Sequence, residues 1–185
     1  MNKNIVEEIR KFVEEKCKGH NVGEEIYFNH FVPVVNYSKK LAKKKEVDLE
    51  LVEIAAWLHD IGSIVYERKN HHITGAKIAE EKLNELGYNK DKIELIKKCI
   101  LNHRGSKKNF LESVEEKIIV EADCLTFFDH LEGYFLWVID GDGIKNQKLI
   151  KESVRQKAQN KWNQLSSEAK DLVKLKYEAI MLLFG

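Results

Sequence analysis

Apolar residues recur along this chain at intervals of three and four, which is the spacing of one face of an α-helix. Charged residues fill many of the positions between them, so each apolar stripe has a polar face opposite. The stretches with this period predict helices over residues 3–18, 24–45, 49–61, 71–86, 92–104, 114–139, 144–163 and 167–184. The pattern therefore predicts an all-α protein.

Residues with capping preferences mark where these helices begin and end. A short polar side chain favours a helix start because it accepts from a free backbone N–H, and glycine favours a helix end. Predicted starts are Asp48, Asn70, Asp91 with Glu94, and Ser113 with Glu116. Predicted ends are Gly19, Gly62, Gly87 and Gly105, with a break of the long sixth helix at Gly133 and a turn at residues 140–143.

The second predicted helix contains Pro33, the only proline of the chain. Proline has no backbone N–H, so the bond to the carbonyl of Asn29 cannot form. We therefore expect this helix either to start near Asn29 or to kink there.

Composition fits a single helical domain. The chain has 185 residues, of which 43% are hydrophobic and 33% charged, which is enough to bury a sizeable core. The formal net charge is only +1, so the overall charge does not favour nucleic acid or an acidic membrane as a partner. No repeat or long linker divides the sequence, and the last 45 or so residues are expected to pack against the rest.

The cysteines and the first residues favour a cytoplasmic protein. The three cysteines, Cys17, Cys99 and Cys124, form no C-x-x-C pair, so reduced thiols are expected rather than disulfides or a cysteine zinc site. The first 16 residues carry charges throughout and have no apolar signal region. No apolar run approaches transmembrane length.

Two histidines that could bind a metal stand at predicted helix ends. His59 and Asp60 follow the apolar stretch 54–58, and His103 lies two residues before Gly105. Carbonyl groups at a helix C-terminus favour a nearby cation. Asp123 lies within the otherwise apolar stretch 118–128, where a buried acid needs a metal ion or a basic side chain as its partner.

These stretches resemble the HD superfamily of metal-dependent phosphohydrolases. The matching segments are HFVPVVNYSKKLA, AAWLHDIG and VEADCL, in the family's order of a histidine, a His-Asp pair and an aspartate. The resemblance covers about residues 26–130 and implies a helical HD core, with residues 131–185 as a helical extension packed on it. It also implies that His30, His59, Asp60 and Asp123 are metal ligands.

Two further segments resemble the HD proteins that hold two metals. HHITGAKIA matches their H-x-x-x-G segment, and ILNHRG matches the histidine late in the next helix. By that resemblance His71 and His103 would bind a second ion, with Asp60 bridging the two. Helical periodicity instead favours His72 for the inward side, so the choice between His71 and His72 stays open.

One branch of the superfamily, the HD-GYP proteins, fits poorly. That branch has two adjacent histidines where this chain has His103 and Arg104, and its Gly-Tyr-Pro signature is missing. The departure argues against cyclic dinucleotides as substrates. Arg104 could instead hold a phosphate with both arms of its guanidinium, or it could simply belong to a solvated basic loop.

The resemblance implies a reaction and a set of metals. Imidazole and carboxylate ligands suit Fe, Mn, Zn, Co or Ni, and two such ions would activate a water to attack phosphorus, with Asp60 and Arg104 as catalytic residues. The expected substrate is a small phosphomonoester or phosphoanhydride, with a nucleotide or dinucleoside polyphosphate as the class that the resemblance favours. Two alternatives stay open, a di-iron oxygenase of the HD type and a nucleotide sensor without turnover. The oligomeric state is not predicted.

Overall fold

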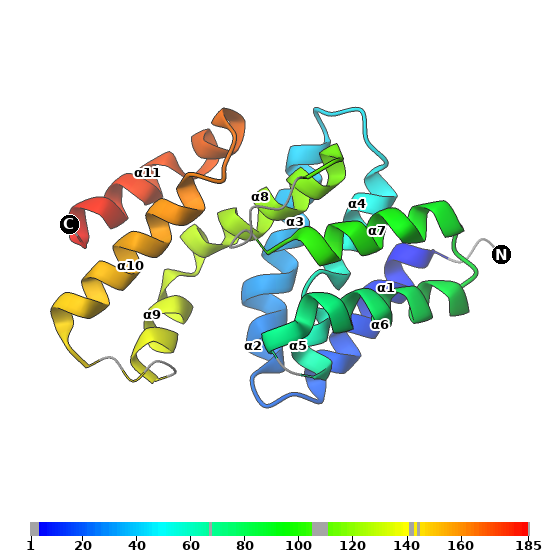
Figure 1. Ribbon diagram of the computed structural model, residues 1–185, viewed down its shortest axis with the longest axis horizontal. Helices are drawn as coiled ribbons and strands as arrows, with labels where there is room; N and C mark the ends of the chain where they lie inside the picture. Colours follow the sequence, from blue (N-terminus) through cyan, green and yellow to red (C-terminus); the bar gives the residue numbers. More distant parts are fainter. Residues whose placement is uncertain (1–3, 67, 105–110, 141–142, 144, 185) are drawn as a thin grey trace. The chain divides into compact units, whose positions relative to one another are not determined.

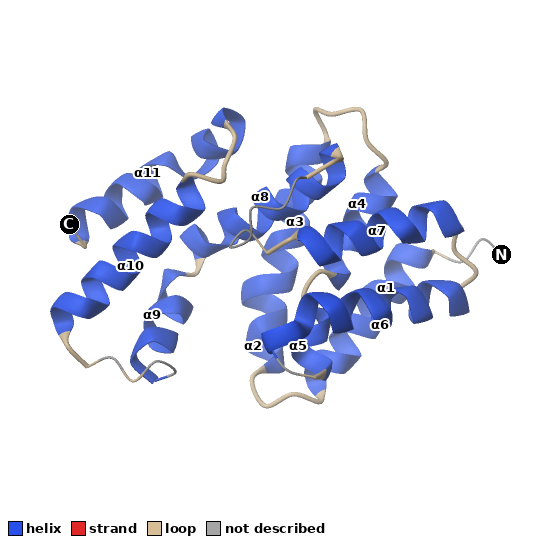
Figure 2. Ribbon diagram, viewed as in Figure 1, coloured by secondary structure: helices blue, strands red, loops and turns tan. Residues whose placement is uncertain are grey.

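The fold is all-α, as the pattern of apolar residues predicts. The computed structural model describes residues 4–66, 68–104, 111–140, 143 and 145–184. Within these ranges the chain forms helices and no strand (Figures 1 and 2). None of the described helices is both long and apolar enough to cross a membrane.

The chain divides into two compact units, Met1–Ala122 and Asp123–Gly185. In the first unit α6 packs on α7 and α5, and α4 packs on α1, α3 and α7 (Figure 1). Its elements are α1 (Ile5–Lys18), α2 (Gly23–Ile26), the π-helical turn η1 (Tyr27–Phe31), α3 (Val32–Ala42), α4 (Leu49–Leu58), α5 (Ile61–Val65), the 3-10 helix η2 (Arg68–Asn70), α6 (His71–Glu85), α7 (Lys90–Asn102) and the first part of α8 (Val114–Asp129). Most of these helices contribute fully buried side chains to the core, among them Ile9, Leu41, Ile54, Leu58, Leu83 and Ile96.

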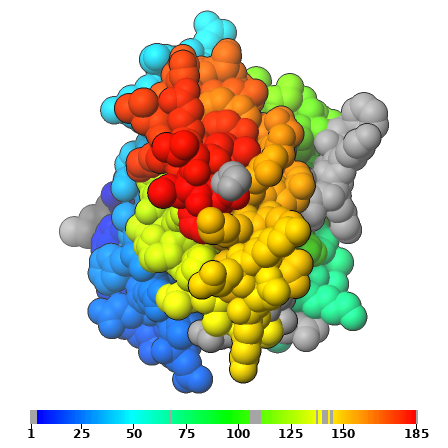
Figure 3. All heavy atoms as spheres, turned by 90° about the vertical axis from the view of Figure 1, so that its left-hand side faces the viewer, coloured from blue at the N-terminus to red at the C-terminus, as the bar shows by residue number. Residues whose placement is uncertain are grey.

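The second unit contains the rest of α8 with α9 (Leu131–Asp140), α10 (Gln147–Trp162) and α11 (Ser167–Leu183). α10 packs on both α9 and α11, and Figure 3 shows α10 (yellow to orange) beside α11 (red). Trp162 and Tyr177 stack between these two helices with ring centroids 4.1 Å apart. The structure describes each of the two units by itself. The expected packing of residues 131–185 on the HD core therefore stays a prediction.

Several predicted helix starts and ends are confirmed. Asp48 accepts a hydrogen bond from the backbone N–H of Leu51 at the start of α4. Ser113 and Glu116 form the reciprocal capping box at the start of α8. α6 ends just before Gly87, whose φ of +72° is the left-handed conformation that favours glycine.

Pro33 is accommodated by a π-helical turn. The backbone N–H of Val32 donates to the carbonyl of Tyr27, five residues back, so this turn holds one residue more than an α-helical turn. A wider turn suits the residues before a proline, because the proline ring clashes with the carbonyl four residues earlier in a regular α-helix. The helical backbone thus begins at Gly23 and runs through Pro33 by way of this π-helical turn, so it does not start near Asn29.

Three predicted helix boundaries are wrong. Gly62 lies inside α5, because its lack of a side chain serves close packing against α6 rather than a helix stop. Asn89, not Asp91 with Glu94, caps α7 by accepting from the N–H of Lys92. The long helix breaks at His130 instead of Gly133, which is an exposed position within α9. Gly105 and residues 141–142 lie outside the described residues.

Candidate metal centre

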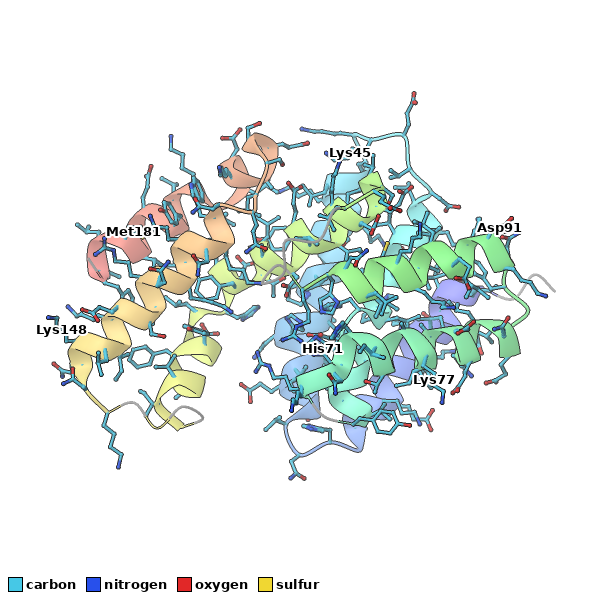
Figure 4. All side chains as sticks on the ribbon, viewed as in Figure 1. Lys45, His71, Lys77, Asp91, Lys148 and Met181 are labelled. Atoms are coloured by element: carbon cyan, nitrogen blue, oxygen red, sulfur yellow. The ribbon has the colours of Figure 1, made fainter. Side chains whose placement is uncertain are left out.

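Four helix junctions in the first unit carry the candidate ligands. His30 lies in η1, His59 and Asp60 connect α4 to α5, His71 is the first residue of α6, and His103 follows the last residue of α7. Figure 4 shows His71 at the start of α6, with Lys77 on the outer side of the same helix. These short elements bring side chains together from positions more than 70 residues apart.

The first group consists of His30, His59 and Asp60. The Nε2 atom of His30 lies 3.0 Å from Asp60 Oδ2 and 3.0 Å from His59 Nε2. His59 Nε2 lies 3.7 Å from the same Asp60 oxygen. Three possible ligand atoms therefore converge on the Oδ2 side of the carboxylate.

The second group consists of Asp60, His71 and His103. The Nε2 atoms of His71 and His103 lie 3.0 and 3.2 Å from Asp60 Oδ1, and 3.1 Å from each other. Asp60 thus belongs to both groups and offers a different oxygen to each. A carboxylate that faces two ligand groups in this way can bridge two ions.

Backbone carbonyls fix the tautomer of three of these histidines. The Nδ1 atoms of His59, His71 and His103 lie 2.6–2.8 Å from the carbonyl oxygens of Ala56, Arg68 and Ile100, each three residues earlier in the chain. A carbonyl can only accept, so Nδ1 must carry the proton. In the neutral ring the lone pair then resides on Nε2, the atom that points into the group.

The donor set fits a divalent transition metal. Two ligand atoms about 2.1 Å from one ion and at about 90° to each other are about 3.0 Å apart, which matches the spacing of 3.0–3.2 Å among Asp60 Oδ1, His71 and His103. Asp60 Oδ1 is also buried and accepts no geometrically sound hydrogen bond within the described chain, despite these short distances. Facing lone pairs of this kind need a cation between them.

The candidate ligands differ in how far their side chains are exposed to solvent. The side chain of His59 is fully buried and those of His71 and His103 are nearly so, whereas His30 and Asp60 are 27% and 22% exposed. Burial alone would raise the pKa of Asp60, but the neighbouring His59 and then His103 hold that pKa well below its ordinary value. Asp60 is therefore an ionised carboxylate, the form that binds metal.

The other predicted site residues do not all belong to these two groups. His71, and not its neighbour His72, is the member of the pair that joins the second group. Arg104 donates from Nη1 to the carbonyl of Lys69 in η2, 3.2 Å away. Asp123 is the first residue of the second unit, where it accepts from Lys161 at 2.6 Å. Its role as a ligand of the first ion stays a prediction.

The sequence model of the HD domain matches residues 27–134, which span every predicted ligand. The chain belongs to the HD-domain family. HD domains bind divalent metals, and each of the two groups described above could hold such an ion. Family membership thus agrees with the chemistry of the donor set.

Three known proteins are similar to this HD domain. An uncharacterized protein of Clostridium beijerinckii is 36% identical over 108 residues, covering 56% of this chain and 66% of that protein. An uncharacterized protein of Methanocaldococcus jannaschii is 32% identical over 123 residues, covering 58% of this chain and 70% of that protein. The crystal structure of a predicted HD superfamily hydrolase from an uncultured Thermotogales bacterium matches with a TM-score of 0.58 and 20% identity, over 97% of this chain and 92% of that one. The last likeness shows the fold alone.

Sequence reasoning missed the groups that hold the ligands in place. The three carbonyls that accept from Nδ1 belong to the backbone and leave no trace in residue type. The close approach of Gly62 to α6 is likewise a tertiary property. The position of a histidine at a helix C-terminus could have indicated such a bond, because the last carbonyls of a helix have no partner within it.

Proposed function

We propose that this protein is a metal-dependent phosphohydrolase that uses a metal-activated water to cleave a phosphomonoester or phosphoanhydride. The observation that supports this most is the position of Asp60 between the two groups, with Oδ2 toward His30 and His59 and Oδ1 toward His71 and His103. A shared carboxylate of this kind suits a pair of ions, which hydrolases use for in-line displacement at phosphorus.

In this proposal the protein residues prepare the centre before substrate arrives. Two bound ions would lower the pKa of a water and neutralise the charge of the phosphate oxygens. Asp60 would hold both ions at a fixed separation. His59, His71 and His103 would keep Nε2 directed at the ions, because their Nδ1 protons remain bonded to backbone carbonyls. No serine or cysteine nucleophile is required.

Arg104 would bind the substrate phosphate beside the second group. Arg104 directly follows His103 of the second group, and one of its N–H groups donates to the backbone carbonyl of Lys69. The bond to a backbone carbonyl restricts the side chain, and the planar guanidinium matches two phosphate oxygens. Arg104 would therefore stabilise the charge that develops during hydrolysis.

The proposed substrate is a small phosphorylated molecule, with a nucleotide or dinucleoside polyphosphate as the first class to test. This part rests on analogy with the superfamily. The balanced charge of the chain, +1, offers no general attraction for nucleic acid or an acidic membrane. A cytoplasmic location goes with this proposal.

The test is purification without added metal, elemental analysis, and then assays of a panel of phosphate esters and nucleotides with Fe, Mn, Zn, Co and Ni. We expect hydrolysis with at least one of these ions, its loss in Asp60→Asn, and its retention in His72→Ala, since His72 belongs to neither group. A metal-loaded protein that hydrolyses nothing in the panel contradicts the proposal. Oxygen consumption by the iron form would then indicate an oxygenase, and nucleotide binding without turnover would indicate a sensor.

A further inference from the structure

The first histidine of the centre lies in the π-helical turn η1, not in a regular helix. Tyr27 opens this turn, Phe31 closes it, and His30 lies between them. An α-helix advances about 100° per residue, so one extra residue rotates the side chains on its two sides by about that angle relative to each other. The direction in which His30 points therefore depends on whether the π-turn is maintained.

Tyr27 anchors the start of this turn to α4. Its ring stacks on the indole of Trp57, with centroids 5.6 Å apart and an interplanar angle of 19°. Both side chains are buried. Trp57 lies two residues before His59, so the stack joins the element that carries His30 directly to the element that carries His59.

A second contact holds Tyr27 through its hydroxyl group. The phenol oxygen of Tyr27 accepts from Arg10 Nη1 at 3.3 Å. Arg10 is in turn paired with Glu7 and Glu14 on α1, at 2.8 and 2.9 Å. Tyr27 is thus fixed by α1 and α4 together.

The other end of the turn contacts the centre itself. The ring of Phe31, which is fully buried, meets the ring of His59 edge to face with centroids 5.6 Å apart. Between these two anchors His30 reaches 3.0 Å from both His59 Nε2 and Asp60 Oδ2. None of these contacts involves His71 or His103.

We propose that Tyr27 and Trp57 are positioning residues that hold the π-turn and thereby set His30 against His59 and Asp60. The inference rests on the proposed function in taking the first group as an ion site. It adds that the ion of the first group depends on this stack, whereas the ion of the second group does not. Neither residue belongs to the two ligand groups.

The test compares metal binding by Tyr27→Leu, Trp57→Leu and Tyr88→Leu. Tyr88 is the matched control, since it is also a buried tyrosine of the first unit, and its hydroxyl bonds Glu50 outside both groups. Zn²⁺ or Co²⁺ is titrated in competition with a chelator, with no substrate present, and thermal unfolding is recorded alongside.

We expect Tyr27→Leu and Trp57→Leu to weaken one of two ions by about tenfold or more, the scale on which supporting residues act. The other ion should keep its affinity. Tyr88→Leu should lower the melting temperature but keep both ions, and Tyr27→Phe, which keeps the ring, should restore most of the lost affinity.

Two results overturn the inference. One is equal destabilisation of the Tyr27 and Tyr88 variants with both ions retained, because the stack would then be structural only. The other is a wild-type protein that binds no ion at the first group. Because metal binding is measured directly, absence of phosphatase activity alongside the expected metal results would count against the proposed function alone.

Discussion

Gly62 packs so closely against His71 that a Cβ atom at residue 62 would lie 2.1 Å from the backbone carbonyl oxygen of His71. The same Cβ would meet the hydroxyl of Thr74 at 2.5 Å and the backbone nitrogen of Gly75 at 2.6 Å. Two of the three nearest atoms are backbone, so the clash cannot be relieved by a rotamer change. The start of α6, and with it His71, is thus held at contact distance from α5.

Gly62→Ala should therefore push α5 away from α6. We expect a loss of about 1–3 kcal/mol in the free energy of unfolding, the usual scale of overpacking, together with weaker binding at the second group. Chemical denaturation and metal titration measure the two effects. Gly133→Ala is the control, because a Cβ there meets nothing within 4 Å. It should be neutral or slightly stabilising, and an equally mild Gly62→Ala would contradict the packing argument.

Asp60→Asn should remove both ions, because one carboxylate serves both groups. The amide keeps the size of the side chain but loses its charge. We expect metal content to fall from about two ions per chain toward zero and activity to fall by at least the roughly 100-fold seen when supporting residues are lost. Elemental analysis after gel filtration is the measurement. Full metal content in Asp60→Asn would exclude the bridging role.

His103→Ala should remove one ion and leave the other. Only the second group loses a ligand, so bound metal should fall from about two ions to about one, as expected for a two-ion centre. His71→Ala should behave in the same way. His72→Ala is the control, being an adjacent and equally buried histidine outside both groups. If His72→Ala lost as much metal as His71→Ala, the choice between the two would have to be reversed.

Metal removal should lower thermal stability. An ion at about 100 times its dissociation constant stabilises the folded state by about 2.7 kcal/mol, which for a chain of this size corresponds to a melting temperature roughly 5–10 °C higher. Differential scanning calorimetry with a chelator, and again after the ion is restored, measures this shift. A melting temperature that does not respond to metal in the wild type would argue against ion binding at either group.

Glu116 should make stability sensitive to acid. Burial would raise its pKa, but the bonds from Asn102 and from Ser113 outweigh burial and hold the pKa below 4.5. A depressed folded-state pKa means that the stabilisation is present above about pH 4.5 and is lost as the pH falls through the lower folded value. Glu116→Gln should cost about 1–2 kcal/mol at neutral pH and should lose less stability on acidification than the wild type.

Urea unfolding between pH 3 and 7 measures this effect. Glu115→Gln is the matched control, since Glu115 is the neighbouring, partly exposed acid of the same helix turn. It should follow the wild-type profile. Identical profiles for all three proteins would show that the capping box contributes nothing through its charge.

Local capping chemistry could be predicted from the sequence. Asp48 and the pair Ser113–Glu116 act within three residues of their own position, so residue type and spacing determine the bond. Asn89 shows the limit of such reasoning. Two good capping residues, Asn89 and Asp91, stand two positions apart, and only the folded backbone determines which one caps α7.

The histidines of the centre and the shared position of Asp60 could be predicted only because the family resemblance supplied them. Helix-end position by itself singles out His59 and His103. The distances within the two groups depend on how α4, α6 and α7 pack, which no local pattern encodes. Pro33 similarly predicts an interruption of the regular α-helix, but it does not predict that the interruption is a π-turn.

The bonds from His59, His71 and His103 to backbone carbonyls also determine which substitutions the centre tolerates. In many metal sites the group that orients a histidine is a side chain, which a single codon change can remove. Here the orienting oxygens belong to residues 56, 68 and 100 whatever their side chains. Substitution at those positions can change packing but cannot delete the acceptor. Random mutagenesis should therefore inactivate this centre through its ligands and its close-packed glycine far more often than through the groups that orient its rings.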